Sequence, residues 1–532
     1  MRKLFAILAI AATASANEIT YKTLQSGPNG TTTPIHDHGL HGEGQIIAFA
    51  DTGVDYDSCF FAEPDGRRPP INTVDLTRRK IIAYDFLYSG DDPNDPFAYD
   101  NTRHGTITAG AAVADRGTPI VHDLDDAIAT GAKAIIQDGG YIGGDNCSQR
   151  PGFGCPVNFT PILAQAYDQG ARIHSNSWGD LQQAVPGETP AANYSVSARD
   201  IDAFVYAHPD FLVVFDTGNS STNDYPPPYS VSAPGCAKNT LQVGGTRSTY
   251  HLDDNILSWF ARVGPTRDGR IKPDVVAPAM AYLPDSDGDI RTNNCNTSIQ
   301  GGTSVASPAV AGAAALVRQY YMSGFYPTGF ANAADALTPS AALLKATIIA
   351  SARSVPLVEA PNAVQSPAPP APNYQQGFGF PVLDDALYFA GDLAKLKIAD
   401  VPPANGLAEG QSTTIRVSAS LRAPLKAVLV WTDPPGVPRT VTDSTPELVN
   451  DLDLRVIDAA GNVHFGNEAL HPNQPDRLNN VEVVSIPAPA AGTYSITVSA
   501  HHLGFGSRQG YALVVTGDIS DAPGRRMRAV RH

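Results

Sequence analysis

The sequence is poor in charged residues and in long apolar runs. Only 17% of its 532 residues are charged and 42% are hydrophobic, which suits a large buried core and two or three domains. Beyond the N-terminus no apolar run is long enough to span a membrane. Acidic residues outnumber basic ones, 53 to 37, and the net charge of −16 argues against a nucleic-acid partner. We therefore expect a soluble monomer that binds neither membranes nor nucleic acids.

The N-terminus is the exception, because it has the composition of a secretory signal peptide. Basic Arg2 and Lys3 precede the apolar run Leu4–Thr13, and the small residues Ala14–Ala16 follow it. This order predicts cleavage after Ala16 (signal peptide, residues 1–16), a secreted, extracellular protein and an N-terminal arm over residues 17–39.

Cysteine is scarce, and secretion gives its few residues a possible role in disulfides. The five are Cys59, Cys147, Cys155, Cys236 and Cys295. Cys147 and Cys155 bracket a turn-rich segment, so we expect these two to pair, and the odd count leaves at least one thiol free or paired between chains. Secretion also permits glycosylation at Asn-X-Ser/Thr sequons. These begin at Asn29, Asn146, Asn158, Asn193, Asn219 and Asn296.

A candidate nucleophile, Ser304, stands in the small-residue run Gln-Gly-Gly-Thr-Ser-Val-Ala-Ser-Pro at residues 300–308. The Ala-rich segment Ala309–Tyr320 is apolar nearly all round up to Val317, which predicts a buried helix with Ser304 at its N-terminus. Unpaired N–H groups and the helix dipole there favour a negative oxygen, as an acyl-transfer intermediate requires. Taken alone, the tripeptide Gly-Thr-Ser is better explained as a helix cap, so the interpretation depends on the residues that accompany it.

Two apolar runs end in polar turns. Residues 45–50 lead into Asp51, and residues 211–216 lead into a turn that carries Asn219. Each run predicts a buried parallel strand, and ligands and catalytic groups gather at the carboxyl ends of such strands. Each polar residue by itself is also a common turn former.

His104 opens a further small-residue segment, residues 104–114, which predicts a closely packed helix. A lone histidine of this kind is more often structural. Together, however, Asp51, His104, Asn219 and Ser304 supply a carboxylate, a base, an amide donor and a hydroxyl. Their order in the chain also differs from that of the α/β-hydrolases, whose Gly-x-Ser-x-Gly motif is absent around Ser304.

With these residues in this order, the chain resembles the subtilisin-like serine proteases, or subtilases. Further similar motifs are Ser175–Gly179, Pro265–Pro278 and Gln376–Asp384. The resemblance implies an α/β catalytic domain over residues 40–392, with a subtilisin-like parallel sheet flanked by helices. It also implies a serine endopeptidase that cleaves polypeptides through an acyl-enzyme, with no cofactor required for the chemistry.

The resemblance assigns roles to individual residues. Ser304 would be the nucleophile, His104 the base and Asp51 the carboxylate that orients it, while Asn219 and the Ser304 N–H would bind the oxyanion. The segment Ser177, Trp178 and Gly179 would pair with an extended peptide substrate. Trp178 is equally explained as a core aromatic residue.

Asp216 and Gly218 would lie beside the primary specificity pocket, where the family often has Ala-Ala-Gly-Asn. A carboxylate at residue 216 would favour Lys or Arg before the scissile bond, unless it only bonds the N–H groups of the turn. The family's second histidine is replaced by Ile107, and about 30 residues after Ala16 are too few for an inhibitory prodomain.

Structural calcium is another family trait. Asp285-Ser-Asp-Gly-Asp289 offers three carboxylates, although the glycine is misplaced for an EF-hand, and a solvated acidic turn is the alternative.

The pattern changes near residue 400. Short alternating strands at 413–418, 427–431 and 493–498 are separated by Pro, Gly and Asn turns, which predicts an antiparallel β-sandwich over residues 396–518. The motifs Leu429–Pro435 and Leu448–Leu454 resemble the jelly-roll domain attached to one branch of subtilases. A carbohydrate-binding module would give a similar pattern. Residues 519–532 are expected to be a frayed basic tail.

Two other functions fit the same residues. A catalytically silent homologue would use the fold only to bind partners, but no member of the triad is missing from the sequence. An esterase or amidase that acts on small acyl substrates would share the chemistry, but it would not need the segment expected to bind extended peptides.

Overall fold

The computed structural model describes residues 17–28, 30–87, 103–117, 123, 125–139, 159–179, 192–220, 225–247, 256–289, 292–360, 365–439 and 442–522. The predicted signal peptide, the predicted Cys147–Cys155 pair and the sequons at Asn29, Asn146 and Asn158 lie outside these residues.

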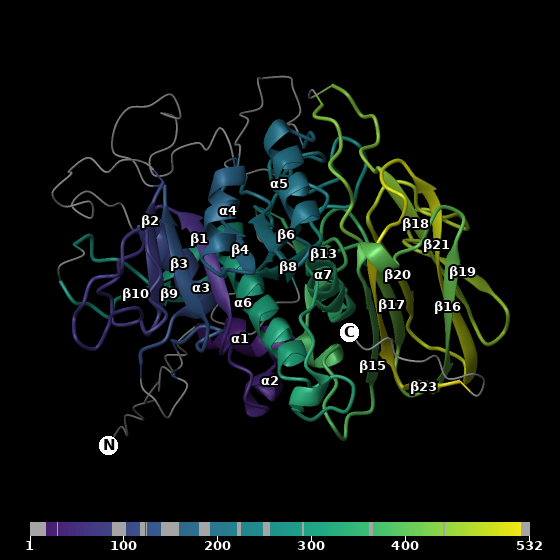
Figure 1. The fold of residues 1–532 in the computed structure, drawn as a ribbon, viewed down its shortest axis with the longest axis horizontal. Helices are drawn as coiled ribbons and strands as arrows, with labels where there is room; N and C mark the ends of the chain where they lie inside the picture. Colours follow the sequence, from purple (N-terminus) through teal and green to yellow (C-terminus); the bar gives the residue numbers. More distant parts are fainter. Residues whose placement is uncertain are drawn as a thin grey trace, which may run out of the picture.

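Seven parallel strands form the centre of the molecule, in the spatial order β2, β3, β1, β4, β5, β6, β8 (Figure 1). Their bounds are β1 Ile46–Asp51, β2 Ile81–Phe86, β3 Lys133–Asp138, β4 Ile173–Asn176, β5 Leu212–Asp216, β6 Leu241–Thr246 and β8 Val275–Pro278. The strands predicted to end at Asp51 and Asp216 are therefore confirmed as β1 and β5. Because the strands are parallel, both residues lie at the carboxyl edge of the sheet.

Short strands extend the sheet beyond β6 or form separate hairpins. The extension consists of β7 Ile256–Leu257, β12 Leu357–Glu359 and β13 Gln365–Pro367. The hairpin pairs are β9 Met280–Pro284 with β10 Thr297–Gly301, and β11 Ala352–Arg353 with β14 Phe380–Pro381.

Helices cover both faces of the sheet (Figure 1). They are α1 Asn17–Ser26, α2 Pro34–Asp37, α3 Arg103–Val113, α4 Thr160–Asp168, α5 Val196–Ala207, α6 Thr303–Met322 and α7 Ala341–Ala350, with 3-10 turns η1 Ala333–Asp335, η2 Leu383–Asp385 and η3 Pro403–Asn405. Both faces of the sheet need a helical layer, because alternate side chains of a strand such as β1 point to opposite faces and both sets are apolar. Ile47 and Phe49 join the core that contains α6, whereas Ala48 and Ala50 join the core beneath α4 and α5.

Helix α6 is buried along almost its whole length, from Val305 to Tyr321. This confirms the buried helix predicted after Ser304. The expected N-terminal arm is also packed, because Leu24 and Ile35 are wholly buried and Gln25 Oε1 accepts bonds from the N–H groups of Ile35 and His36.

The C-terminal region is an all-β second domain, as predicted. Its two antiparallel sheets have the orders β15-β22-β17-β20 and β19-β18-β21-β16-β23. The bounds are β15 Lys395–Val401, β16 Ser412–Ala419, β17 Leu425–Val430, β18 Asn450–Ile457, β19 Val463–Phe465, β20 Val481–Ile486, β21 Gly492–Leu503, β22 Tyr511–Gly517 and β23 Ile519–Asp521. Strand β23 carries the sheet three residues into the segment expected to be a frayed tail.

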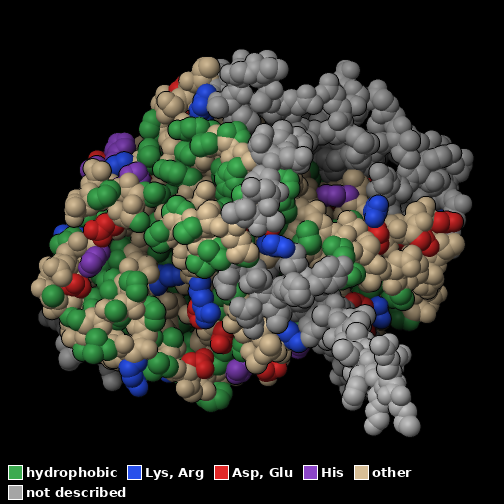
Figure 2. Space-filling model, turned by 180° about the vertical axis from the view of Figure 1, so that it is seen from behind, with side chains coloured by type: hydrophobic (Ala, Val, Ile, Leu, Met, Phe, Trp, Pro, Cys, Tyr) green, Lys and Arg blue, Asp and Glu red, His purple; other side chains and the backbone are tan. Residues whose placement is uncertain are grey.

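The two domains share one packed interface. Trp431 is buried in the core between the two β-sheets, while Val428, Val430 and Val514 on the outer face of the first sheet join the core of the catalytic domain. Helix α7 packs against β17 and β22, so it connects the two domains. Seen from behind, the described surface carries scattered Lys and Arg side chains interspersed with Asp and Glu (Figure 2).

Candidate active site

Asp51 and His104 are joined by a short hydrogen bond at the carboxyl edge of the sheet. His104 Nδ1 lies 2.7 Å from Asp51 Oδ1, and the Asp51 side chain is only 6% exposed whereas that of His104 is 44% exposed. Asp51 Oδ1 also accepts the N–H of Thr52 at 2.7 Å. The carboxylate is thus fixed from the interior, and the imidazole extends from it toward solvent.

The close approach of helix α3 to the turn after β1 makes this contact possible. A Cβ atom on Gly105 would lie 1.8 Å from the carbonyl oxygen of Gly53, so no side chain fits at residue 105. The Gly105 N–H donates to Thr52 Oγ1 at 3.0 Å, which ties the first turn of the helix to the residue after Asp51. This explains why a glycine follows His104 in the sequence.

Thr108 is a part of this site that sequence reasoning missed. Its Oγ1 donates to Asp51 Oδ2 at 3.2 Å. Thr108 lies four residues after His104, and residues at this spacing share one face of a helix, so the signal was present in the sequence.

The electrostatic environment of His104 favours the imidazolium. Burial opposes the charge, but the nearby Asp51 carboxylate outweighs burial and raises the pKa of His104 above its ordinary value. The charge of Asp216 acts in the same direction. A base held in this way gains stability on accepting a proton.

Ser304 lies in the first turn of α6, which packs against α3. Its Oγ donates to the carbonyl oxygen of Ser177 at 3.3 Å, and Ser177 Oγ donates to the Ser304 carbonyl oxygen at 3.0 Å. Among the hydrogen bonds of the described residues, none joins Ser304 to His104. Catalytic hydrogen bonds are often long in ligand-free proteins and tighten when substrate binds.

Asn219 approaches the same helix N-terminus from the turn after β5. Its Oδ1 accepts the N–H of Thr303 at 2.9 Å and lies 3.1 Å from Thr303 Oγ1. Its Nδ2 lies 3.2 Å from the position that a Cβ on Gly302 would occupy. The predicted amide donor is therefore beside Ser304.

Asp216 is buried rather than presented on an open wall. The residue is 2% exposed, and its Oδ2 accepts the hydroxyl of Thr303 at 2.9 Å. Burial raises the pKa of Asp216 to about 6, although the bond from Thr303 and the charge of His104 oppose this rise. Its expected effect on basic substrates stays a prediction.

The remaining predicted substrate-binding residues follow β4 and β5. The indole N–H of Trp178 donates to the Ala50 carbonyl oxygen at 2.9 Å, and its ring meets Phe159 and Phe215 edge-on. Trp178 therefore has the packing of a core aromatic residue, as the alternative interpretation expected. Gly179 approaches Ser232, and Gly218 approaches Arg262.

The acidic turn proposed for calcium uses its carboxylates in protein contacts. Asp285 forms a bidentate pair with Arg103, and Asp287 accepts the Asp289 N–H and the Thr292 hydroxyl. Within the described ranges no three His, Cys, Asp or Glu side chains are grouped as a metal site would require. The carboxylates of Asp285 and Asp287 thus take part in hydrogen bonds within the protein. Calcium binding at this turn stays a prediction.

Two of the sequons differ in accessibility. Asn193 is 8% exposed and its Nδ2 donates to the Arg439 carbonyl oxygen at 2.8 Å, which occupies the atom that would carry a glycan. Asn296 is exposed.

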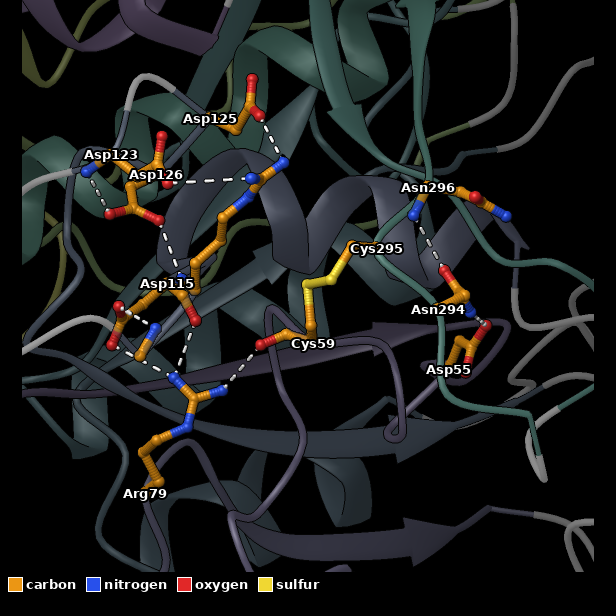
Figure 3. The surroundings of a disulfide bond; sticks show 12 residues. Asp55, Cys59, Arg79, Asp115, Asp123, Asp125, Asp126, Asn294, Cys295 and Asn296 are labelled. Atoms are coloured by element: carbon orange, nitrogen blue, oxygen red, sulfur yellow. Dashed lines mark hydrogen bonds and ion pairs between the residues drawn. A yellow bond between two sulfur atoms is a disulfide. The ribbon is translucent and has the colours of Figure 1, made fainter.

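A disulfide joins Cys59 to Cys295 (Figure 3). Cys59 follows the Asp51 turn, and Cys295 precedes the strand that ends at Gly301; they are separated by 236 residues. The Cys59 N–H also donates to the Asn294 carbonyl oxygen at 2.7 Å. This pairing was not predicted, and Cys236 is a buried free thiol.

Comparison with known families agrees with the fold. The model of the subtilase family, peptidase S8, matches residues 42–379, which is more than half of the chain. The chain therefore belongs to the subtilase family and is a serine peptidase by class. None of the helices in the described residues is long and apolar enough to cross a bilayer.

Several curated proteins are similar in sequence. The serine protease/ABC transporter B family protein tagA of Dictyostelium discoideum is 27% identical over 602 aligned residues, which cover 94% of this chain and 32% of that protein. The chain thus spans about a third of the length of the Dictyostelium relatives. The thermophilic serine proteinase of Bacillus sp. strain AK1 is 28% identical over 304 residues, 57% of this chain and 59% of that protein.

Among solved structures, the serine protease of Aeromonas sobria aligns with 94% of this chain and 93% of its own, at 15% identity and a TM-score of 0.41.

Proposed function

We propose that the protein is a secreted serine endopeptidase with Asp51, His104 and Ser304 as its triad. The observation that carries the proposal is the 2.7 Å bond between the buried Asp51 carboxylate and the half-exposed His104 imidazole. A carboxylate in this position holds the imidazole with its other nitrogen, Nε2, available as the base. Ser304 is at the start of a helix that packs against the helix of His104.

In the proposed reaction, His104 Nε2 removes the proton from Ser304 Oγ as this oxygen attacks a peptide carbonyl carbon. The carbon becomes tetrahedral, and its oxygen gains the negative charge. The Asn219 amide, the Ser304 N–H and the dipole of α6 would stabilise that charge. The imidazolium then protonates the leaving amine, and water releases the acyl group by the reverse steps.

An extended polypeptide is the proposed substrate. The segment Ser177–Gly179 follows β4 at the same sheet edge, and Ser177 exchanges hydrogen bonds with Ser304. Backbone pairing with this segment would give affinity with little dependence on side-chain sequence. Secretion is part of the proposal, and the Cys59–Cys295 disulfide supports it because such bonds persist in oxidising compartments.

Labelling with a fluorophosphonate tests the proposal. The wild type should become covalently labelled at Ser304 and should cleave casein, whereas Ser304→Ala should lose both activities. Ser323→Ala is a matched control, because Ser323 caps the opposite end of the same helix. Absence of wild-type labelling would support the silent homologue, and hydrolysis of a small ester without cleavage of casein would support the esterase.

A further inference from the structure

A buried carboxylate lies directly behind the amide proposed to bind the oxyanion. Asp216 ends β5, is 2% exposed and accepts the Thr303 hydroxyl at 2.9 Å. Burial of a carboxylate is costly unless it is hydrogen-bonded. The contact with Thr303 therefore uses the Asp216 side chain inside the protein, where a substrate side chain would not reach it.

Thr303 connects this carboxylate to Asn219. The Thr303 N–H donates to Asn219 Oδ1 at 2.9 Å, and Thr303 Oγ1 lies 3.1 Å from the same atom. An atom that accepts a backbone N–H must be the amide oxygen, so the amide nitrogen is on the opposite side of the group. Nδ2 makes no hydrogen bond to the described residues, and it can donate to a substrate.

We propose that Asp216 is a positioning residue, which fixes Thr303 so that Thr303 holds Asn219 Oδ1 and leaves Nδ2 directed at the substrate oxyanion. The inference rests on the proposed proteolytic function, because it assigns a role in the same reaction. In this role Asp216 orients the Asn219 amide, and it does not select substrates that carry Lys or Arg.

The connection works in both protonation states of Asp216. When Asp216 is ionised, the Thr303 hydroxyl donates to it and the Thr303 N–H alone holds Asn219. When Asp216 is neutral, its O–H donates to Thr303 Oγ1, and the Thr303 hydroxyl can then donate to Asn219 Oδ1. The neutral form also removes a negative charge from the neighbourhood of the oxyanion, and burial favours that form.

A double-mutant cycle with Asp216→Ala and Asn219→Ala tests the proposal, with kcat and KM measured on matched peptides that carry Arg or Leu before the scissile bond. Loss of an oxyanion donor typically lowers kcat by about 100-fold or more, and we expect misorientation by Asp216→Ala to cost about tenfold. KM should stay within about twofold for both peptides, because ground-state binding is not changed.

Two further variants separate orientation from general damage. Asp216→Asn keeps an acceptor for the Thr303 hydroxyl and should restore kcat to within about threefold of wild type. Thr303→Val removes the hydroxyl and should reproduce the loss in Asp216→Ala. In the Asn219→Ala background, Asp216→Ala should change kcat by less than about twofold, since its target is already absent.

An equal loss in both backgrounds would overturn the proposal, as would a rise in KM confined to the Arg peptide. Crystal structures of Asp216→Ala and Asp216→Asn give a readout that does not depend on activity. We expect Asn219 Oδ1 to leave the Thr303 N–H only in the alanine variant, and unchanged Thr303 and Asn219 side chains there would also overturn the proposal. If the wild type shows no Ser304-dependent hydrolysis, the proposed function fails, and these structures still decide whether Asp216 orients Asn219.

Discussion

Lys238 of the catalytic domain and Asp433 of the β-domain form an ion pair that is wholly inaccessible to solvent. Lys238 Nζ lies 2.5 Å from Asp433 Oδ2, and both side chains are 0% exposed. Nζ also donates to the carbonyl oxygens of Pro434 and Glu447, so the three hydrogen-bond acceptors around Nζ all come from the β-domain. Asp433 in turn accepts the N–H groups of Val449 and Asn450.

We expect Asp433→Ala to destabilise the whole protein, because it leaves the Lys238 charge buried without its partner. The loss of one partner of a buried pair costs about 3–5 kcal/mol in free energy of unfolding. Thermal and urea unfolding measure the change. The double variant Lys238→Met/Asp433→Leu should recover much of the loss, since two apolar side chains leave no buried charge.

The surface pair between Lys397 and Asp521 gives a matched control for this prediction. Their side chains are 33% and 83% exposed. Lys397→Ala should therefore change the free energy of unfolding by less than about 1 kcal/mol. A similarly small change in Asp433→Ala would show that the buried pair does not couple the two domains.

Asp51→Asn should abolish most activity while the fold remains intact. The amide carries no negative charge, so it cannot stabilise the imidazolium as the carboxylate does, and its NH₂ group can hold the imidazole in the wrong tautomer. In the serine-protease triad the corresponding change lowers kcat by about 10⁴-fold. Measurement of kcat together with the midpoint of thermal unfolding checks this. Near-normal kcat in a folded variant would remove Asp51 from the mechanism.

The pH dependence of kcat/KM should follow the protonation of His104. Only the neutral imidazole accepts a proton from Ser304, so activity should rise with pH around a midpoint above 6.5, the ordinary histidine value. In Asp51→Asn the opposing effect of burial remains, and the midpoint of the residual activity should move down. A midpoint unchanged by this substitution would contradict the assigned pair.

The raised pKa of His104 also makes the stability of the fold depend on pH. Because the pKa of His104 is raised in the folded state, protonation stabilises the fold. This contribution is fully present below about pH 6.5, the unfolded value, and is lost as pH rises through the folded value.

Strands β1 and β5 and the helix that begins beside Ser304 could be predicted because their signals are local. Residues 46–50 form a short apolar run ended by Asp51, and the helix after Ser304 is apolar nearly all round up to Val317. The ion pair between Lys238 and Asp433 could not be predicted, since a buried charge has no distinct sequence pattern. The burial of Asp216 depends likewise on the approach of Thr303 from a segment 87 residues away.

Cysteine pairing is the other feature that local patterns could not give. The prediction that Cys147 pairs with Cys155 rests on their closeness in sequence. Cys59 and Cys295 are brought together only when the turn after β1 meets the β9–β10 hairpin. Disulfide geometry depends on the distance between Cα atoms, here 5.2 Å, and sequence spacing does not determine it.

Removal of this disulfide should lower stability substantially. The bond closes a long loop in the unfolded chain, and removal of a native disulfide typically costs about 2–5 kcal/mol. Cys59→Ala/Cys295→Ala should therefore unfold at a lower temperature than wild type. A reductant should lower the wild-type midpoint by clearly more than that of the variant, in which the predicted Cys147–Cys155 pair would close only a short loop. A reductant effect of equal size in both proteins would point to a different cysteine pair.

Asp57, close to that disulfide, should make stability fall as pH rises. Burial, followed by the hydrogen bond and charge of Asp55 and the charges of Asp287 and Asp289, raises the pKa of Asp57 to about 8. The folded protein therefore holds a proton that the unfolded chain releases near its ordinary value of 3.8. The favourable contribution is complete below pH 3.8, decreases between these two values and is lost above about pH 8.

Asp57→Asn isolates this group, because the amide keeps the shape of the neutral acid and never ionises. In acid the variant should unfold at the same temperature as wild type. At pH values above the folded pKa of Asp57 it should unfold at a higher temperature, because there the wild type carries a charged Asp57 carboxylate beside Asp55. The midpoint of thermal unfolding is measured for both proteins from acid to alkaline pH. All other titrating groups contribute equally to both proteins, so their effects cancel in the difference between the two midpoints. A difference between the two proteins that is independent of pH would mean that Asp57 ionises in the folded state at its ordinary value.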